Sequence, residues 1–126
     1  MTVQGGSILS CTLSNMARQK AYFKPTGPWD MPKGYIIGHI KVTDPEGYPE
    51  YVRRDTPILE SHGARFIVRG GESETPEGVE MGRHVVIEFD SYEAAKAAYN
   101  DPDYQEVADI RRRCAESTII LVEGVE

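Results

Sequence analysis

Apolar positions along the chain gather in four short stretches that are rich in β-branched and aromatic residues, a composition typical of strands. In the third stretch, Val85, Ile87 and Phe89 alternate with Val86 and Glu88, so one face of that strand should be buried. In the second, Phe66 and Val68 should alternate in the same way with Arg65, Ile67 and Arg69. The pattern therefore predicts strands over residues 34–42, 64–69, 84–89 and 118–122.

A helical stretch is expected between the first and second strands. Asp44 can accept hydrogen bonds from the first free N–H groups, and Pro45 suits the first helical position. The helix should continue to about Ser61. Pro57 falls inside it and removes a backbone hydrogen bond, so we expect a kinked or two-piece helix.

A second helical region follows the third strand. Asp90 or Ser91 can cap its start, and Glu93 completes a capping-box pattern with Asp90. Residues 100–102 interrupt the helix with a second cap-then-proline signal, after which it should continue to Ala115. The small side chains within residues 94–98 would allow it to pack closely on a sheet.

The resulting order is β-α-β-β-α-β, which predicts an α+β fold of ferredoxin-like topology with a four-stranded antiparallel sheet. The first and third strands should lie at the centre of the sheet, with the helices on one face. The other face must be buried by something else, and a second copy of the chain is the simplest candidate. We therefore expect a homodimer.

Residues 1–30 lack a regular pattern and end in turn-forming residues, so we interpret them as an N-terminal extension of a domain over residues 31–126. The net charge of −6 makes nucleic-acid binding improbable. The basic run Arg111-Arg112-Arg113 is interpreted as a solvated helix face. No stretch is long and apolar enough to cross a membrane, and the two separated cysteines, Cys11 and Cys114, suit a reducing cytoplasm.

Four segments in order resemble the domain-of-unknown-function 1330 family of the dimeric α+β barrel group: residues 35–48, 63–71, 86–91 and 121–124. The resemblance covers about three quarters of the chain. It implies a homodimer in which two four-stranded sheets pack together. It supplies no reaction, because the wider group contains cofactor-free monooxygenases, isomerases and haem-dependent enzymes.

One group of residues suggests acid–base chemistry. By alternation, His39 on the first strand and Glu88 on the third project from the same sheet face, and Arg69 on the second strand could join them. Here His39 would be the acid/base, Glu88 its orienting partner and Arg69 an anion anchor. The alternative is an ion-pair cluster that fills the dimer interface.

Tyrosines form a second group. Tyr48 and Tyr51 share a face of the first helix with Val52, Asp55 and Leu59, and further tyrosines, Tyr99 and Tyr104, come from the last helical region. A cleft lined by them would suit a small aromatic ligand. The alternative is that they pack the sheet–helix layer.

We therefore expect a protein that binds a small aromatic or carboxylated metabolite between sheet and helices. As an enzyme it would catalyse cofactor-free proton transfer, isomerisation or oxygenation. No metal site or cofactor is expected, because the histidines lack ligand spacing, and a haem enzyme is a weaker option. The alternative function is a non-catalytic ligand-binding or accessory protein.

Overall fold

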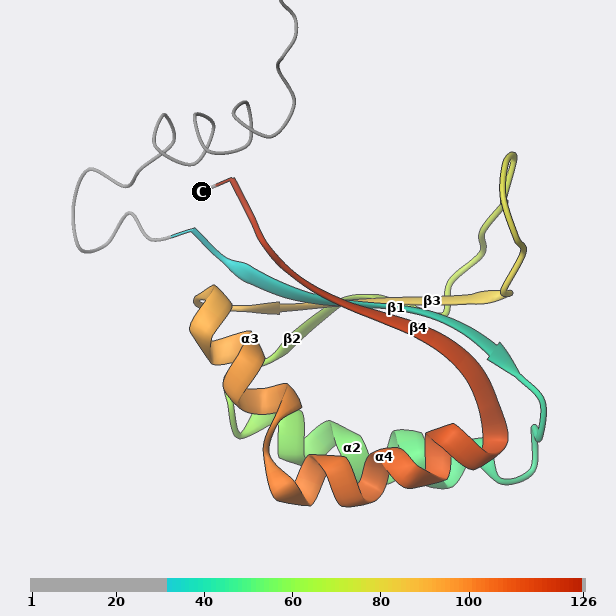
Figure 1. The fold of residues 1–126 in the computed structure, drawn as a ribbon, viewed down its shortest axis with the longest axis horizontal. Coiled ribbons are helices and arrows are strands. Elements are labelled where there is room, and N and C mark those ends of the chain that lie inside the picture. Colours follow the sequence, from blue (N-terminus) through green and yellow to red (C-terminus); the bar gives the residue numbers. More distant parts are fainter. Residues whose placement is uncertain (1–31, 126) are drawn as a thin grey trace, which may run out of the picture. The chain divides into compact units, whose positions relative to one another are not determined.

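The computed structural model describes residues 32–125, so the expected N-terminal extension lies outside the described residues. Seven elements follow one another along this part of the chain (Figure 1). They are β1 Gly34–Val42, α2 Tyr48–Glu60, β2 Arg65–Arg69, β3 Arg83–Phe89, α3 Tyr92–Tyr99, α4 Pro102–Cys114 and β4 Ala115–Glu123.

The four strands form one antiparallel sheet in the order β2-β3-β1-β4. This order confirms the predicted α+β fold of ferredoxin-like topology, with β1 and β3 at the centre. Their register places Ile36 opposite Ile87 and His39 opposite His84. Every second residue of these central strands therefore faces the same side.

All three helices cover one face of the sheet (Figure 1). The apolar positions of β1 and β3 point into this layer and form its core together with the inner faces of the helices. Phe89, Ala95 and Ala98 are fully buried there. The short side chains of Ala95 and Ala98 allow α3 to pack closely on the sheet, as the sequence predicts.

Helix α2 differs from its prediction at both the start and the interior. It begins at Tyr48, because Asp44 caps a preceding turn instead: its Oδ1 accepts hydrogen bonds from the backbone N–H groups of Glu46 and Gly47, each at 3.2 Å. Pro49 takes the first-turn position. The helix then runs through Pro57 without a break, so the two-piece prediction is wrong. Burial of the inner face of the helix offsets the hydrogen bond lost at Pro57.

The caps of α3 and α4 lie where the sequence signals placed them, although Ser91 and not Asp90 caps α3, so the capping box of Asp90 with Glu93 is not formed. The backbone N–H of Ala94 donates to Ser91 Oγ at 3.0 Å, and that of Asp103 donates to Asp101 Oδ1 at 2.8 Å. Pro102 occupies the first turn of α4. Each cap satisfies a backbone donor that the helix itself leaves without a partner.

Strand β2 contains a bulge that changes which side chains face the helices. Phe66 pairs with Ile87 and Val68 with Val86, so Ile67 is an extra residue with no partner in the ladder. The simple alternation expected for this strand is therefore wrong. After the bulge, Arg69 returns to the helix-facing side together with Phe66.

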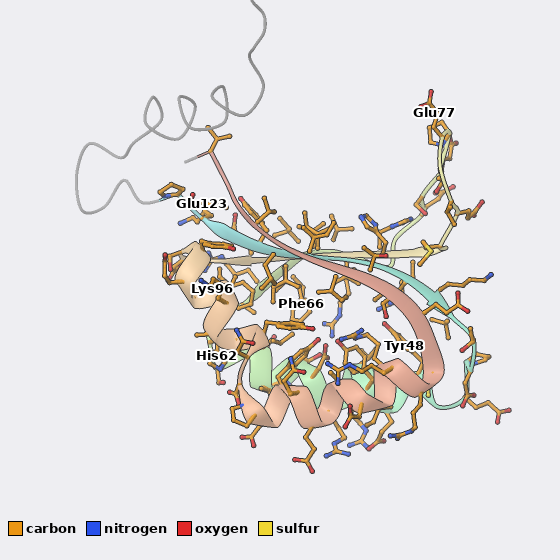
Figure 2. All side chains as sticks on the ribbon, in the orientation of Figure 1. Tyr48, His62, Phe66, Glu77, Lys96 and Glu123 are labelled. Carbon is orange, nitrogen blue, oxygen red and sulfur yellow. The ribbon has the colours of Figure 1, made fainter. Side chains whose placement is uncertain are left out.

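The other sheet face, here called the open face, has no helix over it within residues 32–125 (Figure 1). Val68, Ile120 and Val122 are 40–43% exposed on it. The β2–β3 loop, with Glu77 at its tip, extends away from the sheet on this side (Figure 2). None of the helices in this part of the chain is long and apolar enough to span a bilayer.

Candidate functional site

A cavity lies between the sheet and the helices, in the layer where Figure 2 shows Tyr48 and Phe66. Its volume is about 400 Å³ with the mouth included, but the room for the centre of a water-sized molecule is only about 30 Å³. Apolar side chains of β1 and β3 form its floor. Its polar lining residues are Tyr48, Tyr51, Asp55, Arg69, Arg83 and Tyr104.

Three tyrosines follow one another along the helix side of the cavity. The rings of Tyr48 and Tyr51 lie 5.6 Å apart, and the hydroxyl oxygens of Tyr51 and Tyr104 are 2.8 Å apart. Burial raises the pKa of Tyr48 and raises that of Tyr51 well above its ordinary value. Both hydroxyls are therefore neutral donors. Tyr99 packs on the Tyr104 ring at 5.7 Å but does not line the cavity.

Asp55 is the carboxyl group of this site and is only 5% exposed. Its Oδ1 accepts a hydrogen bond from Thr56 Oγ1 at 3.2 Å and lies 3.9 Å from Arg69 Nη2. Burial raises the pKa of Asp55 to about 6, although Thr56 and Arg69 both favour its charged form. The carboxyl can therefore gain or lose a proton close to neutral pH.

Arg111 is 4% exposed, which corrects the expectation that it lies on a solvated helix face. Its Nη1 donates to Ser117 Oγ at 2.9 Å, and its guanidinium lies over the ring of Tyr51 at 5.6 Å. Arg111 occupies the same helical face as Tyr104 and Val107, which are also buried, whereas Arg112 and Arg113 are exposed. The expectation failed because only the last two arginines point away from the sheet.

Three buried guanidinium N–H groups have no hydrogen-bond partner within residues 32–125. They are Arg83 Nε, Arg111 Nε and Arg111 Nη2. A buried donor without a partner costs about 1–3 kcal/mol, and more when the group is charged. Such donors are unusual in a native protein, and each of them is available to an additional acceptor.

Gly70 makes room for Arg83 at the cavity. Its φ is +71°, a region that favours glycine, and a Cβ there would lie 2.3 Å from Arg83 Nη1. The backbone N–H of Gly70 donates to the carbonyl of His84 at 2.8 Å, which fixes the end of β2 beside Arg83. The guanidinium then lies over the Tyr48 ring at 5.4 Å.

The structure does not bring His39, Glu88 and Arg69 together. His39 Nδ1 lies 2.9 Å from His84 Nδ1 on the open face. Glu88 instead accepts from Arg65 Nε at 2.9 Å and from the Tyr35 hydroxyl at 3.1 Å, and these two hydrogen bonds lower its pKa. Arg69 lies on the helix side because of the bulge in β2.

The sequence prediction missed Asp55, Arg83 and Arg111 as site residues, although each carried a positional signal. Asp55 is four residues after Tyr51 on the same helical face, and Arg111 is seven residues after Tyr104. Arg83 is two residues before Val85 on the buried side of β3. Asp55 was placed on the tyrosine face of the helix but not recognised as a site residue, Arg83 was not considered, and Arg111 was interpreted as exposed because of its charge.

The fold and this site define an α+β protein of ferredoxin-like topology with a cationic cavity between its layers. Residues 33–125 match the family described as Domain of unknown function (DUF1330), and the chain belongs to that family. No functionally curated protein is similar enough to the chain to count as a relative.

Two solved structures show the same fold. One is the RPA0582 protein of unknown function from Rhodopseudomonas palustris, with 18% identity and a TM-score of 0.61, covering 91% of this chain and 95% of that one. The other is SnoaB, a cofactor-independent oxygenase from Streptomyces nogalater, with 15% identity and a TM-score of 0.54, covering 72% of this chain and 91% of that one. At these identities the likeness concerns the fold alone.

Proposed function

We propose that the chain binds a small carboxylate with an aromatic or apolar body in the cavity, and that Asp55 transfers a proton to or from it. The observation that carries this proposal is the set of buried guanidinium N–H groups without partners around one carboxyl group. The reaction class is cofactor-free proton transfer, of which isomerisation is an example.

Charge supports an anionic ligand. Arg69, Arg83 and Arg111 surround or adjoin the cavity, and Asp55 is the carboxyl group that lines it. Three cations against one acid leave the site positive, and a guanidinium donates to a carboxylate in a geometry that suits both groups. A ligand carboxylate would supply the acceptors that Arg83 and Arg111 lack. The tyrosine rings offer a surface for an aromatic body.

Asp55 supports proton transfer at neutral pH. A general base works best when its pKa lies near the working pH, and the pKa of this carboxyl is about 6. An ordinary exposed aspartate would be a weaker base by about two pKa units. Tyr51 remains neutral, and the Tyr51–Tyr104 hydroxyl pair can donate one hydrogen bond that stabilises negative charge on the ligand.

The ligand enters at the side of β2. The guanidinium carbon of Arg69 lies 3.9 Å from the centre of the Phe66 ring. The Arg69 side chain is 32% exposed, whereas that of Asp55 is only 6% exposed. The inner space holds little more than water, so a metabolite must displace this side chain. A ligand carboxylate also competes with Asp55 for Arg69, which favours that movement.

Homodimerisation through the open face is part of this proposal. Its supports are the exposed apolar residues of that face and the absence of a covering helix within residues 32–125. In such an assembly the cavity stays on the outer, helix-covered side of each sheet. The dimer would function in the cytoplasm.

The test uses a panel of aromatic and keto acids. Calorimetry measures the binding of each acid, and NMR in D₂O measures the exchange of its C–H protons for deuterium. We expect one class of acid to bind and to exchange. Arg111→Gln should weaken binding at least tenfold, whereas Arg113→Gln, its exposed neighbour on the same helix, should bind as the wild type does. Asp55→Asn should retain binding and lose exchange.

Two outcomes contradict parts of the proposal. Binding without exchange by the wild-type protein favours the alternative function, a non-catalytic carboxylate-binding protein. Equal binding by Arg111→Gln and wild type would show that the buried arginines do not hold the ligand, and the proposed site would be wrong.

A further inference from the structure

The three histidines of the chain divide into a pair and a single residue. His39 and His84 lie directly opposite each other on the two central strands, and their Nδ1 atoms are 2.9 Å apart. His62 lies elsewhere, with its Nε2 2.7 Å from Asp101 Oδ2. Figure 2 shows His62 at the helix side of the domain, away from the open face.

The pair is held on the most constrained part of the sheet. β1 and β3 are both flanked by strands on either side, and the register through His39 continues to Thr118 of β4. Side chains at directly opposite positions have Cβ atoms about 4.5–5.5 Å apart, which suits convergence of two imidazoles on one point. Both rings are half-buried and are reachable from the open face in the single chain, before a second copy covers that face.

We propose that His39 and His84 form a two-histidine site for a divalent transition-metal ion, with Cu(II) and Ni(II) preferred. This site goes beyond the proposed function and lies on the opposite side of the sheet from the cavity. Groups of three or more His, Cys, Asp or Glu arranged for a metal are absent from residues 32–125. In the single chain the ion therefore keeps open positions for water.

The distance between the nitrogens fits a square-planar or tetragonal ion with the least movement of the rings. With metal–nitrogen bonds of about 2.0–2.1 Å, two nitrogens 2.9 Å apart subtend an angle of about 90° at the ion. Square-planar and tetragonal ions, Cu(II) and Ni(II), need that angle between neighbouring ligands. A tetrahedral Zn(II) ion would need the nitrogens about 3.3 Å apart.

The surroundings favour nitrogen ligation over oxygen ligation. Along the ladder, the neighbours of the histidine pair in one direction are Ile37 and Val86, which pair with each other. In the other direction they are Lys41 and Glu116, which also pair with each other. Among the residues that the structure describes, no carboxylate pair adjoins the histidines in the ladder. Hard cations such as Mg²⁺ and Ca²⁺, which need several oxygens, are therefore disfavoured. Imidazole is a good ligand for copper and nickel.

A bound metal ion would also replace the hydrogen bond that joins the two imidazole rings in its absence. At 2.9 Å one Nδ1 must donate a hydrogen bond and the other must accept it, so the pair cannot hold a proton on both Nδ1 atoms. In the metal complex both Nδ1 lone pairs point at the ion and the protons reside on Nε2. The rings need only small rotations to change from one arrangement to the other.

The test uses the full chain with Cys11→Ser, so that this thiol does not bind or reduce copper. Cu(II) is titrated and followed by electron paramagnetic resonance, and Ni(II) and Zn(II) by calorimetry. We expect one Cu(II) per chain, with hyperfine splitting from two nitrogens, and tighter binding of Ni(II) than of Zn(II). His39→Gln and His84→Gln should each weaken Cu(II) binding about tenfold or more, and His62→Gln should not.

Circular dichroism establishes that the glutamine variants are folded, and Ile37→Val, next to the pair, serves as a second control that should keep full binding. A copper signal that persists in both His39→Gln and His84→Gln would overturn the proposal. A Zn(II) affinity above that for Ni(II) would overturn the assignment of the metal. Failure of carboxylates to bind in the cavity would leave this site unaffected.

Discussion

Asp55 and Arg111 show at the residue scale how a helical face can bury a charged side chain. Each lies in line with tyrosines that pack against the sheet, and each is at most 5% exposed. Burial disfavours the charged form of Asp55. Arg69 Nη2 lies 3.9 Å from Asp55 Oδ1, so the attraction between the two groups offsets only part of this penalty. The protein therefore keeps a carboxyl group in its interior at a cost in stability.

The pH dependence of stability should reveal that cost. The pKa of Asp55 is about 6 in the folded chain and near 3.8 when exposed, so the folded state binds the proton more tightly. Stability from this group is fully present below about pH 4 and is lost as the pH rises through 6, by about 3 kcal/mol in total. The variant Asp55→Asn has no titrating group at this position and so lacks this dependence.

Urea unfolding of the wild type and of Asp55→Asn between pH 4 and pH 7.5 measures this difference. The stability of Asp55→Asn relative to the wild type should increase as the pH rises, because the two proteins have all their other titrating groups in common. Asp101→Asn is the matched control: hydrogen bonding to His62 lowers the pKa of Asp101, so the contribution of its carboxylate is lost only below about pH 4, and the difference in stability from the wild type should change little between pH 5 and pH 7.5. A pH-independent difference between Asp55→Asn and wild type would contradict the burial argument.

At the scale of elements, close contacts decide where helices sit on the sheet. The start of α3 rests against Gly34 at the beginning of β1. A Cβ on Gly34 would lie 2.3 Å from the carbonyl oxygen of Ser91 and 2.5 Å from Tyr92 Cα. Backbone atoms on both sides cannot yield as a flexible side chain does, so the contact requires glycine.

Gly34→Ala should therefore destabilise the domain by about 2–3 kcal/mol, by forcing α3 away from the sheet. Gly71→Ala is the control, because nothing lies within 4 Å of the position of its Cβ. Thermal unfolding of the two variants gives the comparison. Equal midpoints would show that α3 is not held against Gly34.

The sequence predicted elements better than it predicted the site. Alternation in β3 and the caps at Ser91 and Asp101 are local signals, and the structure follows them. The bulge at Ile67 left no such signal, because it depends on how β2 pairs with β3. That one extra residue moved Arg69 to the other face and separated it from His39. The candidate site thus depended on a non-local pairing that alternation cannot show.

At the scale of the whole molecule, the domain has one covered and one open sheet face. Ile120, on the edge strand β4, is 40% exposed on the open face, in register with Ile37 of the central strand β1. Apolar residues grouped on one surface of a soluble protein mark a contact with another molecule. The proposed homodimer buries them.

Ile120→Lys should shift the protein from dimer to monomer, because it places a charge in the proposed interface without a partner. Val79→Lys is the control, since Val79 is the most exposed of the large apolar residues described and lies in the β2–β3 loop. Light scattering after size exclusion gives the mass of each variant. A wild-type chain that is monomeric at all concentrations would contradict the proposed assembly.

The junction between α4 and β4 has a mechanical consequence. Cys114 ends the helix and Ala115 begins the strand, so no linker separates them. The carbonyl of Cys114 accepts from the N–H groups of Thr43 and Asp44, and Arg111 reaches across the corner to Ser117. Helix and strand are therefore coupled at this corner, so a ligand that displaces Arg111 should also shift the start of β4 at the edge of the sheet.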